Sequence, residues 1–403
     1  MQKLFRQFFQ HESASGILLI LAMILALVAA NTPLQHAYNH FLSLPVIVAI
    51  GDFSIAKPLL LWINDGLMAL FFLLIGLELK REILIGHLNQ AGKIILPAIA
   101  AVGGMLVPAL IYVAINHDNP LALRGWAIPT ATDIAFALGI LSLLGSRIPA
   151  SLKIFLASLA IFDDVGAIII IAIFYTDNLS LSALLGAALG LLILWWMNRK
   201  NVTSISAYLL IGLVVWVSLL KSGVHATLAG VAVALFIPLK VRDQKGHLHH
   251  PLQKLENDLH TPINFLVLPL FAFANAGLPL LDLSLKDLFN GIPLGIMLGL
   301  FFGKQLGVML FTWLAVKWRM GKLPEDISYS QLYGVAILCG VGFTMSLFIA
   351  SLAFTPVAGD HPLNDRLGIL AGSIVSAILG YCWLAFAAKA KPATSSPTHG
   401  SNS

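Results

Sequence analysis

Long apolar runs, interrupted by short polar stretches, constrain what this chain can fold into more than any other feature. A window long enough to cross about 30 Å of hydrocarbon finds about twelve of them. The composition agrees, because 58% of the residues are hydrophobic, 11% are charged and the mean hydropathy is +0.89. A soluble globular domain carries more charge than this. We therefore expect an all-α polytopic membrane protein, with spans near residues 14–30, 59–79, 94–115, 125–144, 154–175, 181–197, 205–220, 223–238, 261–276, 291–312, 329–352 and 364–387.

The same pattern predicts one transmembrane domain over residues 1–390 and a disordered cytoplasmic tail over residues 391–403. The first apolar run has no small-residue cleavage site after it, so we interpret it as a retained helix and not as a signal peptide. The tail is polar and low in apolar content, which is typical of disorder. Residues 45–58 alternate around Gly51 and Asp52 as a β-hairpin does.

The positions of lysine and arginine predict how the chain is oriented. Of the 24 Lys and Arg residues, 18 fall on one side of the expected spans, 5 fall on the other, and Lys304 lies inside a span. Basic residues are enriched in cytoplasmic loops, so we expect both termini in the cytoplasm and an even number of spans. The net charge of +5 then reflects topology and gives no reason to expect nucleic-acid binding. The hairpin falls on the periplasmic side, where its exposed edges favour pairing with a second subunit in a homodimer.

Two adjacent aspartates, Asp163 and Asp164, lie in an apolar run, ten residues after Lys153 and thirteen before Asp177. This spacing places both carboxyl groups near the middle of the bilayer. A charged group there costs about 2.5–3.5 kcal/mol on insertion scales, so such residues mark ion or proton pathways. The alternative interpretation is that the pair lies at the end of a shorter helix.

Two expected spans carry signals for a break near their middle. In the fourth span, Asp133 follows Pro129 and the threonines Thr130 and Thr132. Interrupted backbone is tolerated at membrane depth only where other protein or a water-filled cavity satisfies its polar groups. In the eleventh span the signal is Gly340–Gly342, followed by the polar residues Thr344 and Ser346. Glycine at such positions is also typical of close helix packing.

Lys304 lies at the centre of the tenth expected span. A lysine at that depth needs a partner, and the candidates are a midplane aspartate or the negative carbonyl ends of the broken helices. Asp133 could in the same way face their positive amino ends. The other interpretation, that the lysine snorkels to an interface, requires it to reach about 15 Å.

The order of these spans predicts an internal repeat. Each half of the chain contains a full helix, then a broken helix, then another full helix, and the third helix of the first half carries the aspartate pair. The two sets enter the membrane from opposite sides. This is the pattern of inverted-topology repeats with two discontinuous crossing helices, in which the site lies where the breaks meet. The two sets are 94–115, 125–144 and 154–175, and 291–312, 329–352 and 364–387.

Five stretches of the sequence resemble the NhaA-type sodium/proton antiporters, and the similarity runs from Leu4 to about Lys389. They are PTATDIAFALGILSLLGSRIP, LKIFLASLAIFDDVGAIIIIAIFY, LPLFAFANAG, GLFFGKQLGV and ILCGVGFTMSLFI. Inverted repeats are an established feature of that family, so the repeat and the resemblance are not independent observations. The resemblance implies a bacterial inner-membrane antiporter that exports Na⁺ or Li⁺ in exchange for H⁺. It also implies electrogenic exchange, with more than one H⁺ per Na⁺, and activation at alkaline pH.

The resemblance implies roles for individual residues as well. The ion-binding and transport residues of the family fall on Asp163 and Asp164, as Na⁺ ligands, and on Asp133, Thr132 and Lys304. Its pH-responsive cluster falls on Glu78, Arg81, Glu82 and Glu256. The family has a histidine directly after this last glutamate and another three residues further on, whereas this chain has Asn257 and then His260.

The chemistry of the residues fits ion exchange without a cofactor. Na⁺ is a hard cation, and hard cations take oxygen ligands. Burial disfavours a charged carboxylate and a nearby lysine favours it, so H⁺ and Na⁺ can compete for one site near the working pH.

An enzyme is not expected, because FDDVG lacks both the separated aspartates of an intramembrane aspartyl protease and the third carboxylate of a prenyltransferase. A passive cation channel, or a transporter of another substrate on the same fold, remains an alternative. The sequence leaves two interpretations of His225: it responds to pH, or it has a hydrogen-bonded packing role.

Overall fold

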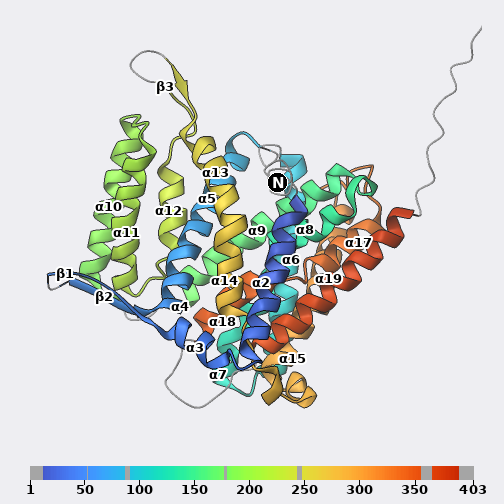
Figure 1. Ribbon diagram of the computed structural model, residues 1–403. Helices are drawn as coiled ribbons and strands as arrows, with labels where there is room; N and C mark the ends of the chain where they lie inside the picture. The colour runs from blue at the N-terminus through green and yellow to red at the C-terminus, as the bar shows by residue number, and fades with distance from the viewer. Residues whose placement is uncertain are drawn as a thin grey trace, which may run out of the picture.

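The computed structural model describes residues 12–51, 53–86, 91–176, 179–242, 247–354 and 365–389, and the expected tail over residues 391–403 lies outside these ranges. Helices dominate the described residues (Figure 1). The elements up to residue 199 are α2 (Glu12–Ala30), α3 (Gln35–Ser43), β1 (Pro45–Ile50), β2 (Phe53–Pro58), α4 (Leu59–Trp62), the π turn η1 (Ile63–Leu67), α5 (Met68–Leu84), α6 (Ala91–Asn116), α7 (Pro120–Leu123), the 3-10 turn η3 (Arg124–Thr130), α8 (Ile134–Leu143), η4 (Gly145–Arg147), α9 (Ala150–Phe174) and α10 (Leu181–Arg199).

The remaining elements include two strands of two residues each, and they end with a long helix that runs along one side of the molecule (red in Figure 1). They are α11 (Ile205–Ser222), α12 (Leu228–Phe236), β3 (Val241–Arg242), β4 (Leu248–His249), α13 (Pro251–Pro262), the π turn η5 (Ile263–Val267), α14 (Leu268–Asn275), η6 (Leu280–Asp282), η7 (Leu285–Phe289), α15 (Gly291–Leu298), the π turn η8 (Gly299–Gly303), α16 (Lys304–Lys317), α17 (Tyr329–Leu338), α18 (Phe343–Ala353) and α19 (Asp365–Lys389).

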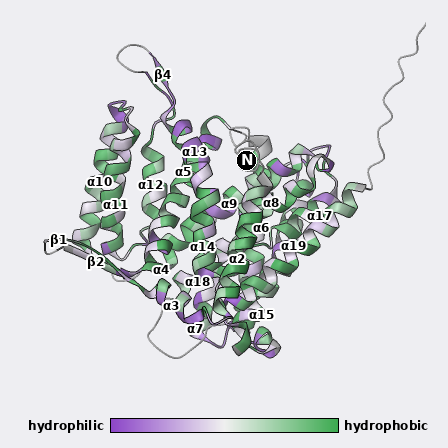
Figure 2. Ribbon diagram, in the orientation of Figure 1, coloured by the Kyte–Doolittle hydropathy of each residue, from purple (hydrophilic) through white to green (hydrophobic). Residues whose placement is uncertain are grey.

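Seven helices of the described residues are long and apolar enough to cross a membrane, and the number reaches ten if each of three bent helix pairs is one span. Figure 2 shows hydrophobic residues along the helices and hydrophilic residues gathered near their ends. The predicted all-α polytopic membrane protein with broken helices is therefore confirmed. Two of the expected spans, near 223–238 and 261–276, fall outside that count, and α12, in the first of them, has only nine residues.

The two breaks lie where the sequence predicts them. The fourth span bends by 41° between residues 130 and 134, and the eleventh bends by 43° between residues 338 and 343. Asp133 caps the amino end of α8, accepting a hydrogen bond from the Phe136 N–H, as an N-cap aspartate does. The Asp133 N–H donates to the Val341 carbonyl oxygen at 2.7 Å. The two broken helices therefore cross at their breaks.

Glycines let α15, η8 and α16 pack closely against α6. They recur every four residues at 291, 295, 299, 303 and 307, so they share one face of the helix. A Cβ added to Gly303 would lie 2.7 Å from Pro108 Cα, and one added to Gly307 would overlap the Gly103 carbonyl oxygen. Only residues without a side chain allow this approach.

The predicted hairpin is present as an antiparallel pair of strands, with Pro45 opposite Pro58 and Ile50 opposite Phe53. Gly51 forms its turn with a positive φ of 57°, which glycine adopts without strain. The Trp62 ring N–H donates to the Val46 carbonyl oxygen at 3.1 Å, and this bond holds the hairpin against the start of the second span.

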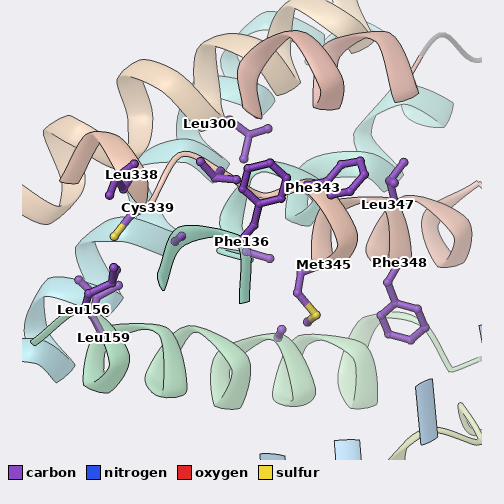
Figure 3. Close-up of a cluster of buried hydrophobic side chains, with 14 of the residues drawn as sticks. Phe136, Leu156, Leu159, Leu300, Leu338, Cys339, Phe343, Met345, Leu347 and Phe348 are labelled. Carbon is purple, nitrogen blue, oxygen red and sulfur yellow. The ribbon is translucent and has the colours of Figure 1, made fainter. Parts of the chain in front are cut away.

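The core around the breaks is apolar. Figure 3 shows side chains from α8, α9, η8, α17 and α18 meeting there, including Phe136, Leu156, Leu300 and Phe343. The Phe136 and Phe343 rings lie 5.7 Å apart, edge to face. The polar groups of the crossing are therefore surrounded by packed apolar side chains.

Candidate ion-binding site

Asp133 lies between the amino ends of the two half-helices α8 and α18. One of its carboxylate oxygens, Oδ1, accepts from the Phe136 N–H of α8 at 2.9 Å. The other, Oδ2, accepts from the Thr344 N–H of α18 at 3.0 Å and from the Thr344 hydroxyl. The carboxylate thus faces two positive helix ends, as the sequence suggested, and its negative charge is stabilised there.

Lys304 pairs with Asp163. Its Nζ lies 2.6 Å from Asp163 Oδ2, and both side chains are fully buried. A lysine that reached an interface would be exposed, so the snorkelling interpretation is wrong. The close packing of α16 on α6 brings the lysine to this position, since a Cβ added to Gly104 would lie 3.7 Å from the Lys304 stem.

Thr132 joins the Asp163 carboxylate to the second broken helix. Its hydroxyl oxygen lies 2.6 Å from Asp163 Oδ2 and 2.9 Å from the carbonyl oxygen of Cys339, the residue after α17. A hydroxyl has one proton to donate, so the two acceptors compete for it. Hydroxyl, carbonyl and carboxylate oxygens therefore converge where the broken helices cross.

The aspartate pair lies near the middle of α9, well inside its ends at Ala150 and Phe174, so the alternative that it marks a helix end is wrong. Both aspartates are at most 2% exposed. Within the described residues, Asp163 Oδ1 and Asp164 Oδ1 are buried and have no hydrogen-bond partner. A buried polar atom without a partner is costly, and a cation or a proton on these oxygens would remove that cost.

A cavity of about 460 Å³ leads toward this pair from the side of α5 and α13. Its walls include Ala135, two residues after Asp133, and Ile161, three residues before Asp164. On a helix a separation of three residues is less than one turn. The cavity therefore comes within one helical turn of the aspartate pair, although neither aspartate lines it, and Glu78, Arg81, Glu82 and His260 do line it.

Comparison with known proteins identifies the family. The family model described as Na⁺/H⁺ antiporter 1 matches residues 6–384. The chain is 57% identical over 389 residues to the Na(+)/H(+) antiporter NhaA of Pseudomonas putida (strain GB-1), an alignment that covers 96% of this chain and 99% of the relative. The chain belongs to the Na⁺/H⁺ antiporter 1 family.

Two further relatives extend the similarity. The Na(+)/H(+) antiporter NhaA of Psychrobacter arcticus is 58% identical over 380 residues, covering 94% of both chains. The Na(+)/H(+) antiporter NhaA of a Nitratiruptor species is 57% identical over 370 residues, covering 92% of this chain and 95% of the relative. The predicted family is confirmed, and the protein is a member of a transporter family and not an enzyme.

Most of the residues assigned to pH response line this cavity or contact a residue that does. Arg81 Nε donates to both carboxylate oxygens of Glu256, at 2.9 and 3.0 Å, and Arg81 Nη1 lies 2.7 Å from Glu82 Oε1. This ion pairing connects α5 to α13. Asn257 and His260 are exposed on α13.

His225 lies apart from this cluster, in the loop between α11 and α12. Its Nδ1 is 2.7 Å from the Thr227 hydroxyl and its Nε2 is 3.8 Å from Asp65 Oδ1. The other oxygen of Asp65 pairs with Lys57 of the hairpin at 2.7 Å. Burial lowers the pKa of His225 to about 4, against the opposing effect of Asp65. The structure thus has the hydrogen-bonded packing that the sequence left as one of two possibilities.

Sequence reasoning missed several groups that complete the site. The Cys339 carbonyl oxygen and the Ser373 hydroxyl both contact the crossing, and neither has a sequence signal at its own position. The glycines at four-residue intervals did offer a signal, because that spacing is typical of close helix packing. It would have predicted close packing of this helix face, but not that the partner is α6.

Proposed function

We propose that the protein exchanges Na⁺ or Li⁺ for H⁺ across the bacterial inner membrane, with Asp163 and Asp164 as the residues that carry the ions. The observation that carries this proposal is the pair of buried, unpartnered carboxylate oxygens beside the Lys304 ion pair. The names of the relatives, which are Na⁺/H⁺ antiporters, support the choice of ions.

The oxygens at the crossing suit a hard cation. Carboxylate oxygens of Asp163 and Asp164, the Thr132 hydroxyl and the Cys339 carbonyl are the ligand types that such ions take. Asp133 stabilises the helix ends, and it contributes charge near the site without being one of these ligands. Na⁺ and H⁺ then compete for the same carboxylates, and release of one accompanies binding of the other.

We propose that this exchange is electrogenic. Asp163 and Asp164 together offer two carboxylates for each bound Na⁺, so more than one proton can enter for each cation that leaves. The membrane potential, which is negative inside, then helps to drive Na⁺ out.

One-sided access is supported by a cluster of aromatic rings on the side of the hairpin. Phe348 is fully buried, and its ring lies 5.5 Å from that of Phe72, 5.6 Å from that of His225 and 6.2 Å from that of Phe271. Beyond it, a second cavity of about 550 Å³ is lined by Ser351 and His225. His225 of this cluster lines the second cavity, and Phe71, the neighbour of Phe72, lines the first, so we infer that the rings separate the two cavities. We propose that this is the state open to the cytoplasm and that transport alternates access between the two sides.

We further propose that alkaline pH activates transport through Glu78, Arg81, Glu82, Glu256 and His260. His225 is not included, because its pKa of about 4 leaves it neutral throughout the alkaline range. Glu78, Arg81, Glu82 and His260 line the cavity that approaches Asp164, so their charge would set the local field along it.

The distribution of basic residues supports cytoplasmic termini, and the hairpin supports a homodimer. Ile47 and Val48 of β1 are 62% and 46% exposed. Pairing of this edge with the same hairpin of a second copy would cover them. Mass measurement of the protein in detergent, with and without residues 45–58, tests this assembly.

The first prediction is that Asp164→Asn abolishes exchange while the protein still folds and inserts. The substitution keeps the shape but removes a carboxylate that binds the ions. Purified protein in proteoliposomes, with Na⁺ and H⁺ followed together, measures this. The matched control is Asp118→Asn, because Asp118 is an exposed aspartate away from the site and its loss should leave transport unchanged.

Two outcomes would contradict the proposal. Sodium-driven proton movement at the wild-type level in the Asp164→Asn protein would show that Asp164 does not carry the ions. A wild-type protein that lets Na⁺ pass but cannot move it against its gradient when a pH gradient is imposed would be a passive channel.

A further inference from the structure

α19 reaches the crossing of the broken helices through a serine. The Phe343 N–H, at the first residue of α18, donates to the Ser373 hydroxyl oxygen at 3.1 Å in a buried position. The amino end of a helix has unpaired N–H groups, and each needs a partner when it is buried. Ser373 is that partner for Phe343.

The next N–H along α18 belongs to the ion site. Thr344 donates its N–H to Asp133 Oδ2 at 3.0 Å. Two consecutive donors of one helix end are therefore divided between the site carboxylate and a hydroxyl of α19. Without the hydroxyl, the buried Phe343 N–H would lose its partner, which is costly, and the amino end of α18 would no longer be fixed by α19.

Small residues bring α19 close enough for such a short side chain to make this contact. A Cβ added to Gly372 would lie 3.2 Å from Leu300 of η8, and one added to Gly368 would lie 2.7 Å from Pro293 Cα. Gly380 packs in the same way on Leu338 of α17. α19 is thus held at a fixed distance from both the π turn before Lys304 and the half-helix that ends at the site.

We infer that Ser373 is a positioning residue of the ion site, which fixes the amino end of α18 and through it Asp133 and Thr344. It does not contact the transported ion. The inference deepens the proposed antiport and rests on it for its transport measurements.

Ser376 provides a matched control. It lies one turn further along α19, it is fully buried, and a Cβ added to Gly340 would overlap its hydroxyl oxygen. Within the described residues this hydroxyl has no hydrogen-bond partner. Ser373→Ala and Ser376→Ala therefore remove the same atom from the same helix, and only the first removes a hydrogen bond to the site.

The test measures the apparent KM for Na⁺ and the maximal rate of each variant in proteoliposomes. A hydrogen bond of ordinary strength corresponds to a change of roughly threefold to tenfold. We expect Ser373→Ala to raise the apparent KM by that factor with a maximal rate within about twofold of wild type. Ser373→Thr, which keeps the hydroxyl, should restore the KM, and Ser376→Ala should match wild type.

Equal KM values for Ser373→Ala and Ser376→Ala, whether both unchanged or both raised, would overturn the inference. If Ser373→Ala does not fold, Ser373→Cys takes its place, because a thiol is a weaker acceptor of similar size. Stabilisation of the purified protein against heating by added NaCl, compared with choline chloride, is a second measurement that needs no transport. Wild-type protein that binds Na⁺ in this assay but moves no H⁺ would refute the antiport and leave Ser373 testable by binding alone.

Discussion

At the scale of single residues, the site is organised by the cost of burying charge. Lys304 and Asp163 are both fully buried and lie 2.6 Å apart. Removing one partner of a buried pair leaves the other uncompensated, which costs more than the pair contributes. The ion pair therefore holds α16 to α9.

We predict that Lys304→Ala lowers the free energy of unfolding by about 3–5 kcal/mol. Thermal melting in detergent measures the change. Lys317→Ala is the control, because Lys317 lies on the same helix but is exposed over the Trp313 ring, and its loss should cost at most about 1 kcal/mol. The double variant Lys304→Ala with Asp163→Asn should melt higher than Lys304→Ala, since no unpaired charge remains. Equal melting temperatures of wild type, Lys304→Ala and the double variant would refute the pairing.

His225 gives a prediction about acid stability. Burial lowers its pKa to about 4 in the folded protein, against about 6.5 in an unfolded chain. The unfolded chain therefore binds the proton more tightly, so folding stability is lost as pH falls from 6.5 toward 4 and is retained above 6.5. The loss at the acid end is on the order of 3 kcal/mol.

His225→Gln removes this titration and keeps a side chain that can bond to Thr227. The melting temperature should therefore fall less between pH 7 and pH 4.5 in His225→Gln than in wild type. His117→Gln, at an exposed histidine, is the control and should follow wild type. A wild-type fall in melting temperature no larger than that of His225→Gln would show that His225 is already accessible to protons when folded.

At the scale of helices, the sequence predicted where the chain breaks but not how it packs. Proline and threonine before Asp133, and paired glycines around Val341, disrupt helix geometry locally, so those breaks can be predicted. The pairing of Lys304 with Asp163 and not Asp164 could not, because adjacent helix positions point about 100° apart and only tertiary packing selects one. The π turn of η8 also has no compositional signature, although it directly precedes Lys304.

The α6–α16 contact gives a prediction at this scale. We expect Gly307→Ala to lower the free energy of unfolding by about 1–3 kcal/mol and to reduce exchange, because the added methyl overlaps the Gly103 carbonyl and displaces the helix that carries Lys304. Gly66→Ala is the control, since a Cβ there meets nothing closer than 4.0 Å. Thermal melting and transport assays on both variants measure these effects. Unchanged melting in Gly307→Ala would mean that the helices separate without cost.

At the scale of the whole molecule, one cavity is lined by Glu78, Arg81 and Glu82 and comes within one helical turn of the aspartate pair. Arg81 holds Glu256 of α13 and Glu82 of α5, so a change of charge there would alter the spacing of two helices that form the cavity wall. Simple competition between H⁺ and Na⁺ at Asp164 would also make transport depend on pH. The two explanations differ at saturating Na⁺. Saturation suppresses competition between H⁺ and Na⁺, so a pH dependence that persists there comes from the change in the cavity wall.

Asn257 separates these explanations, because this chain has an exposed asparagine next to the Arg81-bound glutamate. Asparagine does not titrate, so the cluster lacks one group that gains charge as pH falls. We predict that Asn257→His shifts the pH profile of exchange or makes it steeper at saturating Na⁺. Glu256→Gln should also change the profile, because it breaks the two-oxygen pairing with Arg81. Asp258→Asn, at the exposed neighbouring position, is the control. If the profiles of wild type, Asn257→His and Glu256→Gln coincide in the same vesicles, the cluster is no sensor, and competition at Asp163 and Asp164 sets the pH dependence.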